Sequence, residues 1–273
     1  TQVFGELEEM LQELRPHIVS IATPATFHAD LVCRAAAAGV RAIWCEKAMA
    51  ASLQECDRML DICRRHNVLL AVNHQRRWDD DYRAWRQLLD GGAVGTLRSI
   101  QLTFGQGRLC RGGSHWLDLA LWFADRPVVR GWGRLSDPET LDPGGWGVFE
   151  TEGGVVIQLD GRTELRHTWE ATLIGTRGKL HLSLGGAEQE WWRDGGDGWT
   201  RRPLPRNYPV RSPLLNAVEN LVQALEGRQQ LYCSGENGRA AFEAISAIHL
   251  SHHSGGGPIV FPLRERALVI PSL

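Results

Sequence analysis

The sequence places the pair Glu46-Lys47 directly after the apolar run Val40 to Cys45. A lysine at the end of a buried strand lies at the rim of a sheet, where its ammonium group can donate to a substrate hydroxyl or carbonyl. Partial burial would lower the pKa of this lysine toward the range useful for proton transfer. The alternative is a lysine that keeps its charge in water and pairs with Glu46. Lys47 is therefore our first candidate catalytic residue.

A second candidate group consists of His115 and Asp118, which lie three residues apart in the first turn of a predicted helix and so share a face. The segment Gly112-Gly113-Ser114 precedes them, and its glycines allow a backbone or a ligand to approach closely. A histidine near a carboxylate is a plausible acid/base group. The alternative is that Asp118 only favours the positive end of the helix and that His115 is an ordinary polar residue.

A third cluster, NHQRRW at residues 73–78, contains polar, cationic and aromatic side chains. Arg76 and Arg77 could hold an anionic group, and Trp78 could stack on a ring. The alternative is a solvated loop. Trp116 and Trp122 flank the His115 helix, and aromatic faces suit sugars, although most tryptophans are core residues.

Three apolar runs predict the strands that position these groups, and helical segments separate them. We expect strands over His17–Ala22, Val40–Cys45 and Val68–Val72. Helices are expected over Phe27–Ala38, with Thr26 as N-cap, and from Ser52, which opens a capping box with Glu55, to about His66. Strands that are apolar throughout are buried on both faces, which predicts a parallel α/β sheet with covering helices. Ligands bind at the carboxyl ends of such strands. We expect three segments to meet at that edge: Thr23-Pro24, Glu46-Lys47 and Asn73–Trp78.

The pattern changes after Gly95. Leu97–Phe104 alternates as a half-buried strand does, and a helix capped by Ser114 follows over Ser114–Phe123. Short strand candidates separated by turns then predict a mostly antiparallel sheet. Helices over Leu214–Glu226 and Glu236–Ser254 close the chain. We therefore expect two domains, residues 1–95 and 96–273.

The composition excludes several classes of protein. The 273 residues are 43% hydrophobic and 23% charged with a net charge of −2, so no strong field attracts nucleic acid or an anionic membrane. No apolar run approaches the roughly 20 residues of a membrane span. None of the six cysteines forms a C-x-x-C pair, and the pair His252-His253 has no third ligand at metal spacing. We therefore expect buried thiols, no metal and a cytoplasmic location.

Taken together, these segments resemble the glucose–fructose oxidoreductase / inositol dehydrogenase / MocA (Gfo/Idh/MocA) family of NAD(P)-dependent enzymes. VSIATPATFH (19–28) resembles the family's strand, Thr-Pro turn and helix with its histidine, and WCEKAMAAS (44–52) resembles the Glu-Lys-Pro segment with Ala48 at the proline position. GGSHWLDLALWF (112–123) resembles the glycine-rich turn and helix with His and Asp. The order and spacing of the segments carry the resemblance.

The resemblance implies an incomplete Rossmann-like parallel sheet followed by an α+β domain with a mostly antiparallel, open sheet. Lys47 would contact substrate and nicotinamide as proton donor or acceptor, His115 would be catalytic or substrate-binding, and Asp118 would support it. The remaining implied cofactor-binding residues are Thr23, Pro24 and His28 along the nucleotide groove, Glu46 beside the nicotinamide ribose, and Arg77 at the nicotinamide end.

Arg111 departs from the family pattern. Many members carry an aspartate four residues before the histidine, where a carboxylate helps to accept the carbinol proton, and arginine cannot do this. Some members with a similarly short loop also lack the aspartate, so activity need not be lost. An arginine here suggests an anionic substrate. The expected substrate site consists of Lys47, Arg111, His115 and Trp116.

A second departure concerns the start of the family fold. Members begin with a strand, a glycine-rich phosphate turn, a helix and a second strand, a unit of roughly 30 residues or more, and here no G-x-G-x-x-G follows a strand. The chain is either a fragment of a longer enzyme that uses NAD or NADP, or a cofactor-free relative that binds a ligand or partner. We favour the fragment because the other cleft residues are present.

The expected activity is hydride transfer between nicotinamide and a carbinol carbon of a sugar, cyclitol or related polyol. We also expect a homo-oligomer, because the open sheet needs a cover on its outer face.

Overall fold

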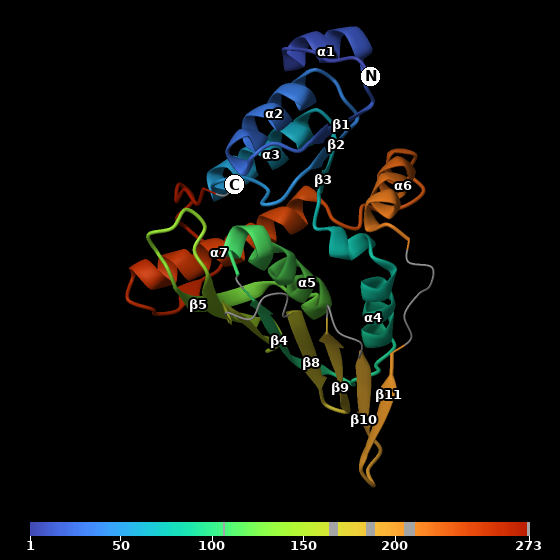
Figure 1. Ribbon diagram of the computed structural model, residues 1–273, viewed down its shortest axis with the longest axis vertical. Helices are drawn as coiled ribbons and strands as arrows, with labels where there is room; N and C mark the ends of the chain where they lie inside the picture. The colour runs from blue at the N-terminus through green and yellow to red at the C-terminus, as the bar shows by residue number, and fades with distance from the viewer. Residues whose placement is uncertain (106, 164–168, 184–188, 205–210, 272–273) are drawn as a thin grey trace.

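The structure is a computed structural model that describes residues 1–105, 107–163, 169–183, 189–204 and 211–271. A small sheet and a large sheet lie on opposite sides of the long helix α7 (Gly235–His253), which contacts both of them (Figure 1). The α/β organisation expected from the sequence is therefore confirmed. Within the described ranges, no helix has both the length and the apolar character that a membrane crossing requires.

The small sheet is parallel, with its strands in chain order β1-β2-β3. Each strand alternates with a helix, as the apolar runs predict. The strands are β1 (Ile18–Ile21), β2 (Ala42–Cys45) and β3 (Leu69–Val72), and the helices are α1 (Leu7–Leu14), α2 (Ala25–Ala37) and α3 (Leu53–Arg65).

Both faces of the small sheet are covered, which explains why its strands do not alternate in polarity. Ile43 belongs to the main core together with residues of α2 and α3. Its neighbour Ala42 points the other way and packs with Ala217 and Leu221 of α6 (Pro213–Leu225). Helix α6 therefore covers the first sheet although it follows the expected boundary at residue 95, which stays a prediction.

Two predicted helix starts have different outcomes. The Ser52 hydroxyl accepts a hydrogen bond from the Glu55 amide at 3.2 Å, so the predicted cap of α3 is confirmed. The Glu55 carboxylate reaches back to the Ala51 amide at 3.0 Å instead of to Ser52. Thr26 does not cap α2, because that helix already begins at Ala25 after the extended Pro24.

The large sheet has the order β11-β10-β9-β8-β4-β7-β6-β5-β12, and β4 with β7 is its only parallel pair among the described strands. The mostly antiparallel second sheet is therefore confirmed. Its strands are β4 (Leu97–Gly105), β5 (Val128–Leu135), β6 (Gly145–Thr151), β7 (Val156–Thr163), β8 (Trp169–Gly175), β9 (Gly178–Ser183), β10 (Glu190–Asp194), β11 (Trp199–Pro203) and β12 (Ile259–Val260).

Helices α5 (Ser114–Ala124) and α7 pack on one face of the large sheet (Figure 1). Glycines under α7 allow a close approach: a Cβ built on Gly133 would lie 2.2 Å from the Trp146 carbonyl and 3.1 Å from Ile248. Only a residue without a side chain fits there.

The glycine-rich segment before α5 has a regular structure that the sequence does not predict. Leu109–Gly113 forms a π-helical turn that runs directly into the helix. Ser114 is therefore already helical and does not cap α5, and its hydroxyl donates to the Cys110 carbonyl at 2.6 Å. The segment expected as a loop at residues 73–78 includes a short 3-10 helix, η1 (Gln75–Trp78), which leads into α4 (Asp80–Asp90).

Candidate active site

The three parallel strands end level with one another, because Cys45 lies opposite Ile21 on one side and Val72 on the other. The segments that follow them therefore emerge at one edge of the sheet. The Asn73 side chain donates to the Glu46 carboxylate at 2.6 Å. This hydrogen bond fixes Glu46 between the ends of the second and third strands.

His28 lies beneath this edge and is fully buried. Its Nε2 pairs with the Thr23 carbonyl at 2.8 Å, and its Nδ1 lies 3.0 Å from the Ala48 carbonyl. Both ring nitrogens are thus occupied by backbone. We interpret His28 as a residue that positions the segments around it, while Thr23 and Pro24 themselves are exposed.

Lys47 is half-buried at the end of β2, and the peptide bond after it is cis. Burial lowers the pKa of the Lys47 ammonium, and the charge of Arg111 lowers it further. The carboxylates of Glu46 and Asp142 oppose this shift. A lowered pKa raises the share of neutral amine, which is the form that accepts a proton.

Lys47 lines a cavity of about 470 Å³. The same cavity is lined by His115 and Trp116 of α5, by Arg76 of η1 and by Trp169 of β8, so both sheets contribute to it. The structure therefore brings together the four residues expected at the substrate, which are Lys47, Arg111, His115 and Trp116.

His115 is partly exposed toward this cavity, but its Nδ1 is buried and has no hydrogen-bond partner. Burial lowers the pKa of His115 well below its usual value, and the neighbouring charge of Arg76 adds to this effect. The imidazole is therefore neutral at physiological pH. A neutral ring carries one donor and one acceptor, which suits the binding of a hydroxyl group.

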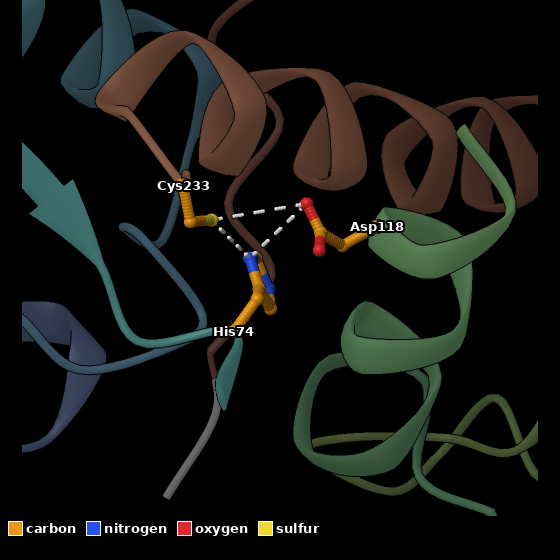
Figure 2. A group of neighbouring side chains, drawn as sticks. All are labelled: His74, Asp118 and Cys233. Carbon is orange, nitrogen blue, oxygen red and sulfur yellow. Dashed lines mark hydrogen bonds and ion pairs between the residues drawn. The ribbon is translucent and has the colours of Figure 1, made fainter. Parts of the chain in front are cut away.

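The resemblance implies that Asp118 supports His115, and in the structure Asp118 pairs with Arg77. It is fully buried and accepts two hydrogen bonds from Arg77 Nε, at 3.0 and 2.9 Å. No described contact joins Asp118 to His115. The centre of the His74 ring lies 5.5 Å from that of the His115 ring. On its other side, His74 Nδ1 is 3.6 Å from the Asp118 carboxylate, as Figure 2 shows. His74 is thus the group through which Asp118 can influence His115.

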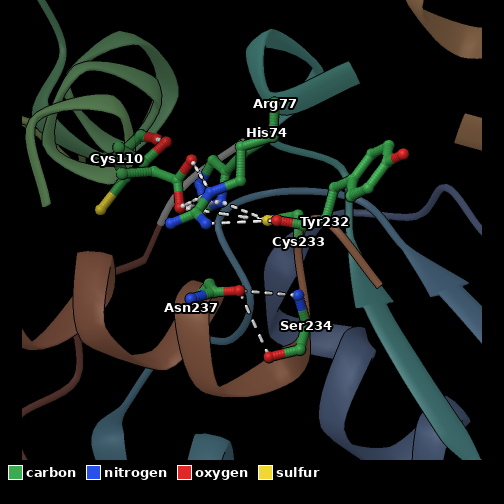
Figure 3. A network of polar contacts seen from close by, with 9 residues as sticks. His74, Arg77, Cys110, Tyr232, Cys233, Ser234 and Asn237 are labelled. Carbon is green, nitrogen blue, oxygen red and sulfur yellow. Dashed lines mark hydrogen bonds and ion pairs between the residues drawn. The ribbon is translucent and has the colours of Figure 1, made fainter. Parts of the chain in front are cut away.

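Arg77 is also buried, and its Nη1 donates to the Tyr232 carbonyl at 3.2 Å. The expectation that Arg77 faces the nicotinamide is not supported by these contacts. Figure 3 shows this arginine within a polar network that also includes His74 and Cys233. The network joins η1, α5 and the segment before α7, because a buried guanidinium needs acceptors on every side.

His74, Asp118 and Cys233 are the only three metal-ligand side chains of the described residues that lie close enough to share an ion, within 4.8 Å of one another. Two facts argue against a metal here. Arg77 already supplies the cation beside Asp118. Burial raises the pKa of the Cys233 thiol well above its usual value, which disfavours the thiolate that a metal would bind.

Asp142 is a carboxylate near the cavity that the sequence does not reveal. Its two oxygens accept hydrogen bonds from the backbone amides of Cys110 and Arg111, at 2.8 and 3.0 Å. Burial raises the pKa of Asp142, and these amides act in the opposite direction. Asp142 thus fixes the turn that carries Arg111, and its charge acts on Lys47.

Of the residues that sequence reasoning missed, His74 had a visible signal, since it follows Asn73 at the end of a predicted strand. Asp142, Trp169 and Cys233 had none, because each reaches the site from a segment distant in sequence.

A family model described as "Oxidoreductase family, NAD-binding Rossmann fold" matches residues 1–74. The chain is 27% identical over 284 residues to D-apiose dehydrogenase of Paraburkholderia graminis, covering 93% of this chain and 76% of that protein. It is 26% identical over 252 residues to inositol 2-dehydrogenase of Rhizobium meliloti, covering 84% and 76%. An uncharacterized oxidoreductase of Schizosaccharomyces pombe is 27% identical over 116 residues, and this match spans only 31% of its length.

Solved structures share the fold. A putative NADPH-dependent oxidoreductase from Desulfitobacterium hafniense superposes with a TM-score of 0.84 at 17% identity, covering 94% of this chain and 83% of that one. The WlbA dehydrogenase of Bordetella pertussis, in complex with NADH and UDP-GlcNAcA, gives 0.80 at 19% identity, with coverages of 96% and 84%.

Proposed function

We propose that this chain acts as an NAD(P)-dependent oxidoreductase of the Gfo/Idh/MocA family and that it transfers hydride between NAD or NADP and a carbinol carbon of a sugar, cyclitol or related polyol. The observation that carries the proposal is the placement of Lys47 and His115 at one cavity, beside Glu46 at the carboxyl edge of the parallel sheet. The names of the relatives that act on apiose and inositol, both polyhydroxylated compounds, support the substrate class.

The residues of this edge fit the nicotinamide end of the cofactor. Thr23 and Pro24 are exposed, Glu46 is held by Asn73, and the buried Asn73 Oδ1 has no partner among the described residues. These residues would hold the ribose, whereas the 273 residues include no G-x-G-x-x-G turn for the diphosphate. When bound, the nicotinamide supplies the carbon that takes up or releases the hydride.

The proton of the substrate hydroxyl moves at Lys47 Nζ. In the direction of oxidation, the neutral amine accepts this proton as the carbinol becomes a carbonyl, and in the direction of reduction the ammonium returns it. His115, being neutral, orients the same hydroxyl by a hydrogen bond. Of the two tryptophans at the cavity, Trp169 is exposed and offers an apolar face to a sugar ring, whereas Trp116 is buried beneath it.

The test compares the chain's two lysines, Lys47 and Lys179. Hydride transfer is followed by the absorbance of the reduced nicotinamide that forms when NAD⁺ or NADP⁺ is mixed with each member of a panel of sugars and cyclitols. Lys47→Ala should lower kcat/KM by about 10²–10⁴-fold, the usual contribution of a general acid or base. Lys179→Ala is the matched control, since Lys179 lies on β9 above the Trp192 ring and outside the cavity.

Unchanged turnover in Lys47→Ala would remove Lys47 from the mechanism. Binding of a sugar that no nicotinamide cofactor alters, with no turnover in either direction, would instead favour a cofactor-free binding protein.

A further inference from the structure

Arg76 is a buried cation at the cavity without an acidic partner among the described residues. The residue is 6% exposed, and it lines the cavity beside Lys47. Its Nε and Nη1 are buried and have no hydrogen-bond partner. A buried guanidinium with unpaired donors is costly unless an acceptor reaches it. A ligand in the cavity is the acceptor that the site offers room for.

The faces of the Arg76 guanidinium are already occupied. Its Cζ lies 4.3 Å from the centre of the Trp116 ring and 5.0 Å from that of Trp169. The Tyr82 hydroxyl also interacts with Arg76, and burial raises the pKa of this phenol to about 12, so Tyr82 is neutral and supplies no counter-charge. Aromatic packing holds the guanidinium in place, while its Nε and Nη1 donors remain without a hydrogen-bond partner.

The adjacent arginine provides a comparison within the same short helix. Arg77 is buried to the same degree, and its charge is balanced by Asp118 at 2.9 Å. Arg77 is therefore a structural cation. Arg76 lies in the same 3-10 helix, but no carboxylate of the described residues balances its charge.

The other charged residues that line the cavity are also positive. Arg108 and Arg111 line it together with Lys47 and Arg76, and no acidic residue of the described part of the chain does so. The nearby Asp142 is held by two backbone amides. Four cations around about 470 Å³ repel one another, and an oxyanion among them would relieve this repulsion.

We propose that the substrate carries an anionic group, a carboxylate or a phosphate, which Arg76 binds with help from Arg108 and Arg111 while the reacting carbinol faces Lys47. The proposal rests on the hydride transfer proposed above and narrows its substrate class to acidic sugars or sugar phosphates. Arginine suits this task because its planar donors match the oxygens of both groups.

The experiment uses glucose, glucuronate and glucose 6-phosphate as probes that share one ring and differ in charge. The steady-state kcat/KM of each probe is measured in the direction of oxidation, with NAD⁺ or NADP⁺ as the hydride acceptor. In the wild type, glucuronate or glucose 6-phosphate should exceed glucose by about tenfold or more, the discrimination expected of one charge-assisted contact. Which of the two exceeds glucose identifies the anionic group.

Variants then assign the effect to Arg76. Arg76→Gln should reduce the preference for the charged probe over glucose toward one, and Arg76→Lys should restore it only in part. Arg83→Gln is the matched control, because Arg83 also stacks on an aromatic ring, that of Tyr232 at 4.0 Å, but lies outside the cavity. If Arg76→Gln does not fold, the exposed pair Arg108→Gln/Arg111→Gln should lower the same preference.

Binding without turnover separates this proposal from the proposed function. Calorimetric titration of the charged probes into the wild type and Arg76→Gln measures the anion site alone. Binding that needs Arg76, without turnover of any probe, would support the site and contradict the hydride transfer. Three results would overturn the proposal of an anionic substrate. The first is equal turnover of glucose and both charged probes, and the second is a preference for the charged probe over glucose that Arg76→Gln leaves unchanged. The third is that no charged probe binds.

Discussion

Arg77 and Asp118 form an ion pair that is withdrawn from water, and each depends on the other for its charge. Removing one partner leaves an uncompensated buried charge, so Asp118→Ala should lower the free energy of unfolding by about 3–5 kcal/mol. The double variant Arg77→Met/Asp118→Leu removes both charges and should lose less than the sum of the single variants. Urea unfolding measures all of these values, and additive losses would contradict a coupled pair.

The family resemblance implies instead that Asp118 takes part in catalysis, which can be distinguished from a purely positioning role. A catalytic Asp118 would lower kcat in Asp118→Asn while the protein stays folded. A positioning Asp118 would mainly lower stability, because His74 separates it from His115. Comparing kcat with the unfolding free energy of the same variant therefore decides between the two roles.

His74 makes stability depend on pH. Burial lowers the pKa of His74 from 6.5 to about 4 in the folded protein. The unfolded chain therefore takes up the proton first as the pH falls, so the contribution of His74 is complete above pH 6.5 and declines between pH 6.5 and 4. Between pH 7.5 and pH 5 this histidine should remove about 2 kcal/mol of stability.

The measurement is urea unfolding of the wild type and His74→Gln at both pH values. The variant should lose most of this part of the pH dependence, whereas His66→Gln, at the exposed end of α3, should keep it. His249 is a second buried histidine with a pKa lowered to about 4. Its protonation lowers the free energy of unfolding as the pH falls, in the wild type and in both variants alike. An equal pH dependence in the wild type and His74→Gln would show that His74 does not contribute.

At the scale of elements, α7 depends on glycines in the sheet beneath it. A Cβ at Gly133 would meet the Trp146 carbonyl, which is backbone and cannot rotate away. Gly133→Ala should therefore destabilise the protein by about 1–3 kcal/mol, as overpacked cores do. Gly257→Ala is the control, since a Cβ there meets nothing within 4 Å. Equal unfolding midpoints for the two variants would contradict this account of the packing.

Some of these elements could be predicted from the sequence and others could not, and the difference has a physical reason. The strands β1, β2 and β3 were foreseen because burial on both faces leaves continuous apolar runs. The cap at Ser52 was foreseen because its partner, Glu55, is local. The π-helical turn before α5 was not, since Asp142, about thirty residues later, holds its amides.

The same distinction applies to the candidate site. The sequence identified Lys47 and His115, because each follows a local signal, a strand end or a glycine-rich turn. It did not predict the partners of His28 and Arg77, which are the Ala48 carbonyl and the Asp118 carboxylate. Contacts of this kind depend on the tertiary structure, and no local pattern encodes them.

For the molecule as a whole, the two sheets do not have separate cores. The main core extends from Ile43 of the small sheet through Ile245 of α7 to Leu173 of the large sheet. Helix α6 closes the outer face of the small sheet from a position late in the sequence. We therefore expect the two sheets to unfold as one cooperative unit, although the sequence suggests two domains.

Amide hydrogen exchange tests this cooperativity, because it reports each sheet separately. The slowest amides of β2 and β8 should open with the same free energy. Ile245→Ala, which empties a fully buried position in α7, should lower both by about 2–5 kcal/mol. Val260→Ala is the control, since Val260 is 72% exposed. A loss confined to one sheet would mean that α7 stabilises that sheet alone, and the boundary expected at residue 95 would then divide two independently folding units.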